Sequence, residues 1–174
     1  MRIKLTLLLL VLTISNSYSQ SPDKLEKWRP SEIDTLTVAQ DMFDDLNFMM
    51  AYPFLNHLLT NHPQDYRLKY MVGICSLVKP EEYARGLSLL LDVYKNNKSA
   101  EDIEYYVALA YHYNDKFEEA IDIVDIYLKK KLTKPQIRGA EKLKEHCNAK
   151  KKIVPMEDEG KLEDYINTNA TGAK

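Results

Sequence analysis

Small and hydrophobic residues recur along the chain at a regular spacing, and this spacing predicts the fold. Two small residues mark each of three units, and corresponding sites lie 34 or 35 positions apart. These sites are Ala39 and Ala51, Gly73 and Gly86, and Ala108 and Ala120. Hydrophobic residues follow each second site four and seven positions later, on one helical face; they are Leu55 and Leu58, Leu90 and Val93, and Val124 and Tyr127. A period of this length predicts three stacked units, each made of two helices.

Breaks in this pattern separate the units, and a seventh helix is predicted after the third. Pro63 ends the first unit, Lys-Asn-Asn-Lys at 95–98 ends the second, and a lysine-rich run at 129–135 ends the third. Pro135 suits the first turn of a helix, and one face of that helix would hold Ile137, Ala140, Leu143 and Cys147. Such a helix covers the hydrophobic side that the last unit of a stack leaves exposed. We therefore expect an all-α solenoid over residues 31–152, with three helix pairs and a C-terminal capping helix.

The two ends of the chain do not follow the repeat. Arg2 and Lys4 precede an apolar run at 5–14, and small polar residues ending in Ser-Tyr-Ser at 17–19 follow it. This order is typical of a secretory signal peptide, and the run of ten positions is shorter than the roughly 20 residues that a membrane-spanning helix needs. We expect a signal peptide at 1–19, a linker at 20–30, a mature chain that starts near Gln20, and a disordered acidic and polar tail at 153–174.

Charge divides the chain into an acidic body and a basic end. Residues 20–128 hold 10 bases and 19 acids, a net charge of −9, whereas residues 129–152 hold 10 bases and 2 acids, a net charge of +8. The last segment, from Ile153 onward, holds 2 bases and 5 acids, which gives −3. A nucleic-acid-binding protein needs a dominant basic surface. We therefore expect no nucleic-acid partner.

Residues with catalytic or metal-binding chemistry do not form a recognisable pattern. His57 and His62 are five positions apart, which turns them about 140° from each other on a helix, and neither His112 nor His146 completes a metal-ligand spacing. Glycine-rich phosphate loops, G-x-S-x-G and H-E-x-x-H do not occur in the sequence. We expect no catalytic residues, no metal site and no cofactor. The two cysteines, 72 positions apart, are expected to be buried and reduced.

The best-preserved stretch, 108–120, reads Ala-Leu-Ala-Tyr-His-Tyr-Asn-Asp-Lys-Phe-Glu-Glu-Ala. It combines both small sites with Asn-Asp at the turn and Phe117 at the corner between helices, and here the chain resembles the tetratricopeptide repeat family over about residues 31–150. More narrowly, the run 138–153, with Glu-His-Cys-Asn-Ala-Lys-Lys at 145–151, and the following acidic segment resemble the end of the tetratricopeptide part of certain large bacterial envelope proteins. In those proteins β-propeller repeats and an OmpA-like peptidoglycan-binding domain come next. Neither lies within these 174 residues, so the resemblance does not carry the peptidoglycan role over to this sequence, which is either a fragment of such a protein or a reduced relative.

The resemblance implies a concave groove, built from the first helix of each pair, that holds a peptide or a helix of a partner protein. Alignment at the small sites transfers this groove to Leu36, Gln40, Phe43, Arg67, Tyr70, Ile74, Leu77, Tyr105, Leu109, His112 and Tyr113. Family members that clamp a terminal carboxylate use Lys and Asn where this chain has Leu36 and Gln40. We therefore do not expect that mode of binding.

Two functions follow from these features. The first is an exported interaction scaffold of the bacterial envelope, periplasmic or associated with the outer membrane, that binds a protein partner in its groove. The second is a surface-associating module whose basic C-terminal helix binds anionic lipid or polysaccharide. The acidic body offers the basic end a partner within the molecule, so the scaffold is the preferred hypothesis.

Overall fold

The computed structural model describes residues 28–97 and 100–151, and in this part the chain is helical with no strand. The seven α-helices of the described part are α1 (Pro30–Asp44), α2 (Phe48–Asn61), α3 (Tyr66–Cys75), α4 (Tyr83–Asn96), α5 (Ile103–Tyr113), α6 (Phe117–Tyr127) and α7 (Lys134–Asn148). The predicted all-α class is confirmed. The predicted signal peptide (1–19), the linker up to residue 27 and the tail (153–174) lie outside the described residues.

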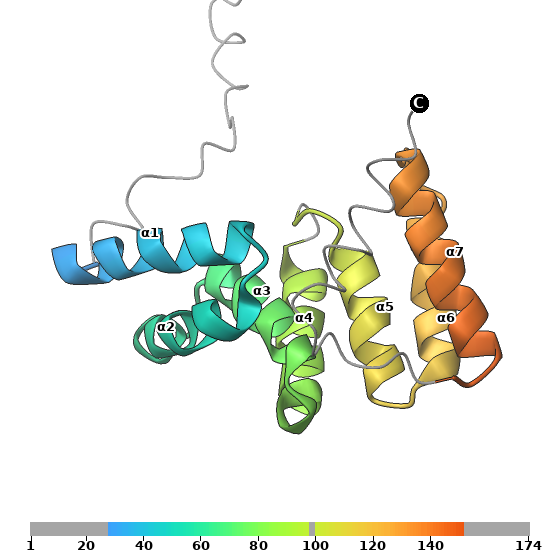
Figure 1. Ribbon diagram of the computed structural model, residues 1–174, viewed down its shortest axis with the longest axis horizontal. Helices are drawn as coiled ribbons and strands as arrows, with labels where there is room; N and C mark the ends of the chain where they lie inside the picture. Colours follow the sequence, from blue (N-terminus) through green and yellow to red (C-terminus); the bar gives the residue numbers. More distant parts are fainter. Residues whose placement is uncertain (1–27, 98–99, 152–174) are drawn as a thin grey trace, which may run out of the picture.

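The helices stack in the order of the sequence, and each packs against the next. Figure 1 shows α1 and α2 at one end of the molecule, α3 and α4 in the middle, and α5 to α7 at the other end. The first two helices run nearly across the direction of the last three in this view, so the helix direction changes along the stack. Helix α7 packs on α6 and also touches α5, at the position expected of a capping helix.

The hydrophobic positions of the repeat form the core of the stack. The six residues four and seven positions after the second small sites are at most 1% exposed: Leu55, Leu58, Leu90, Val93, Val124 and Tyr127. On α7 the predicted inner face is also buried at Ala140, Leu143 and Cys147, whereas Ile137 is 37% exposed. Each helix therefore buries one stripe, and the stack shares one continuous core.

Small residues stand where helices approach most closely. Ala39, Ala51, Ala108 and Ala120 are fully buried. A β-carbon added to Gly73 would lie 2.7 Å from Cγ of Leu90, and one added to Gly86 would lie 2.9 Å from Cβ of Ser76. These separations are shorter than two carbon atoms tolerate without moving, so glycine at both sites permits the close approach of α3 to α4.

Three helices end in the same way, with a non-glycine residue in the left-handed conformation. The φ angles are 62° at Leu46, 60° at Asp115 and 48° at Lys150, after α1, α5 and α7. In each case the next N–H donates to the carbonyl five positions earlier, at 2.8 to 3.0 Å, which gives a helix-terminal carbonyl a partner. The end of α3 differs. Gly73 and Gly86 are 13 positions apart, one more than the small sites of the other two units, and two short 3-10 helices, η2 (Ser76–Val78) and η3 (Pro80–Glu82), accommodate the extra residue.

Candidate functional site

The structure divides the eleven residues of the predicted groove into two groups. Six are buried between helices: Leu36, Ile74, Leu77, Leu109, His112 and Tyr113. Tyr113, for example, stacks on Tyr83 of α4 with ring centroids 4.8 Å apart. The five that reach the surface are Gln40 and Arg67, which are exposed, and Phe43, Tyr70 and Tyr105, which are half-buried. A partner can therefore touch only the second group directly.

The half-buried rings of this group are in contact with one another across three units. Phe43 on α1 lies 6.4 Å from Tyr70 on α3, and Tyr70 lies 5.9 Å from Tyr106 on α5, between ring centroids. Tyr106 in turn meets Tyr105 at 5.8 Å. We call Phe43, Tyr70, Tyr105 and Tyr106 the aromatic line. Tyr106 was not among the predicted groove residues, although it stands beside Tyr105 in the sequence.

A hydrogen bond fixes the position of Tyr70, the central ring of the aromatic line. The hydroxyl of Tyr70 donates to the backbone carbonyl of Glu101 at 2.8 Å, which joins α3 to the connection before α5. Burial raises the pKa of Tyr70 above its ordinary range and that of Tyr106 to about 12. Both hydroxyls therefore stay protonated around neutral pH, and each remains able to donate a hydrogen bond.

Asp102 holds the same connection to the C-terminal end of the stack. Its backbone is left-handed, with φ of 46°. Its carboxylate accepts a hydrogen bond of 2.7 Å from the Tyr127 hydroxyl and two of 3.0 Å from Nε2 of Gln136. One carboxylate thus links α5 to α6 and α7. Residues 101 and 102, the first of which Tyr70 contacts, are together hydrogen-bonded to α3, α6 and α7. Such contacts hold this part of the aromatic line in a fixed geometry.

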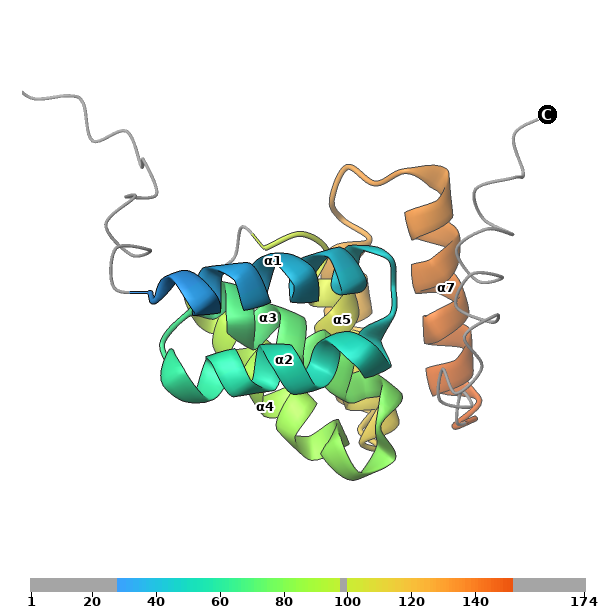
Figure 2. The same ribbon diagram turned by 60° about the vertical axis from the view of Figure 1, so that its left-hand side comes forward.

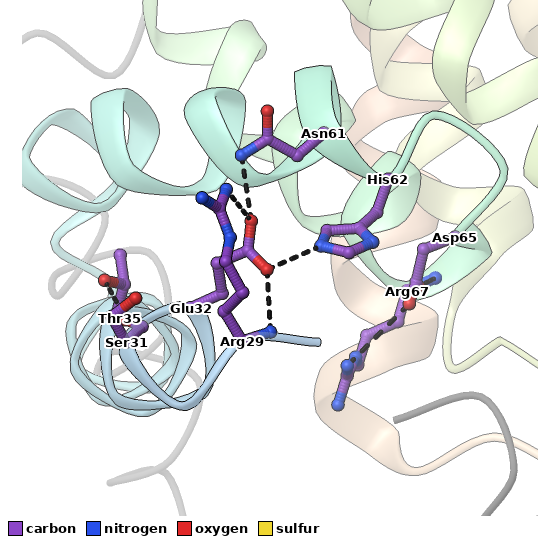
Figure 3. A network of polar contacts seen from close by, with 8 residues as sticks. All are labelled: Arg29, Ser31, Glu32, Thr35, Asn61, His62, Asp65 and Arg67. Atoms are coloured by element: carbon purple, nitrogen blue, oxygen red, sulfur yellow. Dashed lines mark hydrogen bonds and ion pairs between the residues drawn. The ribbon is translucent and has the colours of Figure 1, made fainter. Parts of the chain in front are cut away.

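A second polar cluster lies at the opposite end of the stack and joins α1 to the end of α2 (Figure 3). Glu32 is 7% exposed, and its carboxylate accepts hydrogen bonds from the Arg29 side chain (2.9 Å), the Arg29 backbone (3.0 Å) and Nδ2 of Asn61 (3.0 Å). Nε2 of His62 lies 3.3 Å from the same carboxylate. The hydrogen bonds from Arg29 lower the pKa of Glu32 to about 2. Because Arg29 and Asn61 donate to the Glu32 carboxylate from both sides of the α1–α2 contact, this cluster is a structural clamp.

Trp28 extends this clamp beyond the predicted start of the helical domain. Its ring stacks on His62 with centroids 4.0 Å apart and an interplanar angle of 9°. The Arg67 guanidinium lies 5.6 Å from the same ring, which is the distance of a cation–π contact. Arg67, a predicted groove residue, is therefore engaged beside α1 and does not extend the aromatic line.

A buried cysteine and histidine meet between α5 and α7. Nδ1 of His112 lies 3.2 Å from Sγ of Cys147, and both side chains are at most 1% exposed. Burial raises the pKa of Cys147 to about 11 and that of Cys75 to about 12. Both thiols are therefore protonated at neutral pH, and a thiol without access to solvent is chemically inert. Both cysteines are free and buried, as the sequence predicts.

Other kinds of site were sought in the part of the chain that the structure describes. No group of three His, Cys, Asp or Glu side chains there could hold a metal ion. None of the helices there combines the length and the hydrophobicity of a membrane span. Comparison of the chain with protein-family models, curated proteins and solved structures found no match.

Proposed function

We propose that the chain is a protein–protein interaction scaffold of tetratricopeptide type, and that a peptide or a helix of its partner binds along the aromatic line. One observation carries this proposal: rings from the first helices of three successive pairs, at Phe43, Tyr70 and Tyr106, touch one another and are only half-buried. An extended partner spans several units of a solenoid. Tyrosine gives such a partner a large contact area with little side-chain entropy to lose.

Repeated local geometry supports the tetratricopeptide architecture. The left-handed residue that ends α1 recurs 69 positions later, at about twice the repeat length, after α5. The small residues are buried in every pair. In the second pair, Gly73 and Gly86 let α3 and α4 approach each other so closely that an added β-carbon would collide with the facing helix. Recurrence of these features at the repeat spacing supports a repeated helix pair.

We place this scaffold in the bacterial envelope, in the periplasm or at the outer membrane. This placement rests on the order of charged, apolar and small residues in 1–19 and on the resemblance of 138–153 to envelope proteins. The alternative, a basic end that binds anionic lipid or polysaccharide, receives less support. Lys130, Lys144 and Lys150 already pair with Glu104, Asp125 and Glu118 at 2.6, 2.5 and 3.7 Å.

Site-specific crosslinking tests the proposed function. A photo-crosslinking residue at Gln40, which is exposed beside the aromatic line, should capture the partner in cells of the source organism. The same residue at Ser88, which is exposed on α4, should not. Mass spectrometry of the crosslinked product would then identify the partner.

Paired variants connect that capture to the aromatic line. Replacing Phe43 and Tyr105 with Ser should reduce capture at Gln40 by roughly tenfold or more, because truncated aromatic anchors typically lose more than about 1 kcal/mol. Tyr94→Ser on α4 removes an equally half-buried tyrosine and should leave capture unchanged. Equal loss in both variants, or full capture by a double variant with native circular dichroism, would move the binding surface elsewhere.

A further inference from the structure

Exposed hydrophobic side chains gather at the two ends of the stack. In the described part of the chain, the large hydrophobic side chains that are 37% to 54% exposed are Ile33, Val38, Met49, Met50, Phe54, Ile126 and Ile137. The first five belong to α1 and α2, and the last two belong to α6 and α7. Helices α3, α4 and α5 contribute none. Exposed hydrophobic groups confined to particular faces mark contact surfaces more often than scattered ones do.

The N-terminal end presents exposed hydrophobic side chains on both α1 and α2 and exposed acidic side chains on α1. Asp34, Val38 and Asp41 on α1 and Asp45, the residue that caps its C-terminus, are exposed and recur at i, i+4, i+7 and i+11. This spacing places them on one stripe, away from the buried Leu36. Met50 and Phe54 are spaced i and i+4 on α2. Figure 2 shows α1 and α2 side by side in front of the helices that follow. We call these six residues the acidic end surface.

The charge of this surface specifies the chemistry of what covers it. Residues 30–61 contain five acids (Glu32, Asp34, Asp41, Asp44 and Asp45) and no Lys or Arg. Only Glu32 makes an ion pair with another described residue. An anionic lipid surface would be repelled. The surface instead fits a cationic partner with hydrophobic side chains of its own.

The opposite end of the same chain has that chemistry. Ile126 and Ile137 each lie within about one turn of the α6–α7 connection, and Lys129, Lys131 and Lys134 lie between them in the sequence. None of these three lysines forms an ion pair with another described residue. Residues 129–151 hold 9 bases and 2 acids, which gives a net charge of +7. We call the two isoleucines and three lysines the basic end surface.

We propose that copies of this chain associate end to end, with the acidic end surface of one copy on the basic end surface of the next. Hydrophobic contact between Val38, Met50 and Phe54 and the two isoleucines supplies the attraction. The aspartates opposite the lysines add a charge attraction that salt weakens, set the orientation and speed the encounter. The two surfaces differ, so each contact leaves one acidic and one basic end open, and association continues beyond a dimer unless it closes into a ring.

Sedimentation velocity on the full chain tests this arrangement. The weight-average mass should rise with protein concentration and fall with added salt, because the charge attraction is screened over about 8 Å at physiological ionic strength. The variant M50Q/F54Q, at the acidic end, and the variant I126Q/I137Q, at the basic end, should each weaken association by roughly tenfold or more. Met49→Gln is the matched control, since Met49 and Met50 are 53% and 54% exposed but lie on different sides of α2.

Mixing the two variants distinguishes end-to-end contact from a symmetric dimer. Each variant keeps one intact end, so the mixture should form a one-to-one complex that neither variant forms alone. A mixture that stays monomeric overturns the proposal, as does association that survives both double substitutions. A chain that is monomeric at all concentrations, yet binds a cationic amphipathic test peptide only when Met50 and Phe54 are intact, would assign the acidic end surface to a foreign partner and would also overturn it.

Discussion

The close approach of α3 and α4 makes Gly73 a direct probe of the repeat geometry. An alanine in place of a glycine inside a helix normally stabilises the protein by about 1 kcal/mol. At Gly73 the new methyl would meet Cγ of Leu90 at 2.7 Å. Leu90 is fully buried and Cγ is its branch point, so the whole side chain would have to move within a packed core. Overpacking of this kind costs about 1 to 3 kcal/mol.

The two effects have opposite signs, and the clash is the larger. Gly73→Ala should therefore destabilise the protein by about 0 to 2 kcal/mol, in place of the usual gain. In a Leu90→Ala background the obstructing atom is gone, so the same substitution should become stabilising by up to about 1 kcal/mol. The coupling between the two substitutions should therefore be at least about 1 kcal/mol, which is within the range measured for residues in contact.

Urea unfolding followed by circular dichroism measures all four corners of this cycle. Ser88→Ala on the exposed face of α4 is the control for helix propensity and should stabilise by a few tenths of a kcal/mol, about the difference in propensity. Equal urea m-values would show that the variants unfold from equally compact states. If Gly73→Ala stabilised the protein by about 1 kcal/mol in both backgrounds, the inferred close packing of α3 on α4 would be wrong.

Three further predictions concern the two ends of the stack. The folded pKa of Glu32 is lowered from 4.5 to about 2. The stability that the Glu32 carboxylate gives the protein is therefore complete above about pH 4.5 and is lost as the pH falls toward 2. Urea midpoints of the wild type should drop more over this range than those of Glu32→Gln. Leu143→Ala removes a fully buried side chain and should cost about 2 to 5 kcal/mol of stability. Replacing Lys150 and Lys151 with Gln should cost at most about 1 kcal/mol, since the Lys150–Glu118 pair is exposed. Thermal melts at low and high salt compare the two variants. Lys150→Gly should raise the melting temperature relative to Lys150→Ala, because φ at this position is 48° and glycine adopts it without the cost of roughly 1 to 2 kcal/mol that a β-carbon brings.

The helices could be predicted because their determinants are local and repeated. The spacing of small residues locates the helix crossings, and the positions four and seven residues later are all core. The residues before α1 gave no such signal. Trp28 lies outside the repeat, and its place is set by the His62 ring and the Arg67 guanidinium, which only the folded chain brings beside it.

The proposed binding surface was harder to predict, because buried and exposed positions on the first helix of a pair lie close together around the helix axis. Leu36 on α1 is 5% exposed, whereas Gln40, about 40° further round the same helix, is exposed. Alignment of small sites gives the register of a helix and not the reach of its side chains. The ring of Tyr106, a residue that the alignment did not select, therefore contacts Tyr70 in the aromatic line. His112, which the alignment did select, is buried and contacts Cys147.

Helix α7 shows how the stack ends within the described residues. Its left-handed terminal residue, Lys150, follows Asp115 by 35 positions, so α7 has the turn of a first helix. The position that corresponds to Ala39 and Ala108 is, however, occupied by Leu143, which is fully buried. An alanine there lets a second helix approach to about 8 to 10 Å, and a leucine holds it further away. Helix α7 thus combines the turn of a repeat with the packing of a cap. In the end-to-end assembly that we propose, α1 and α2 of the next copy would lie beyond α7, where further helices would otherwise continue the stack. The opposite charges of the two ends would select that contact over a symmetric one.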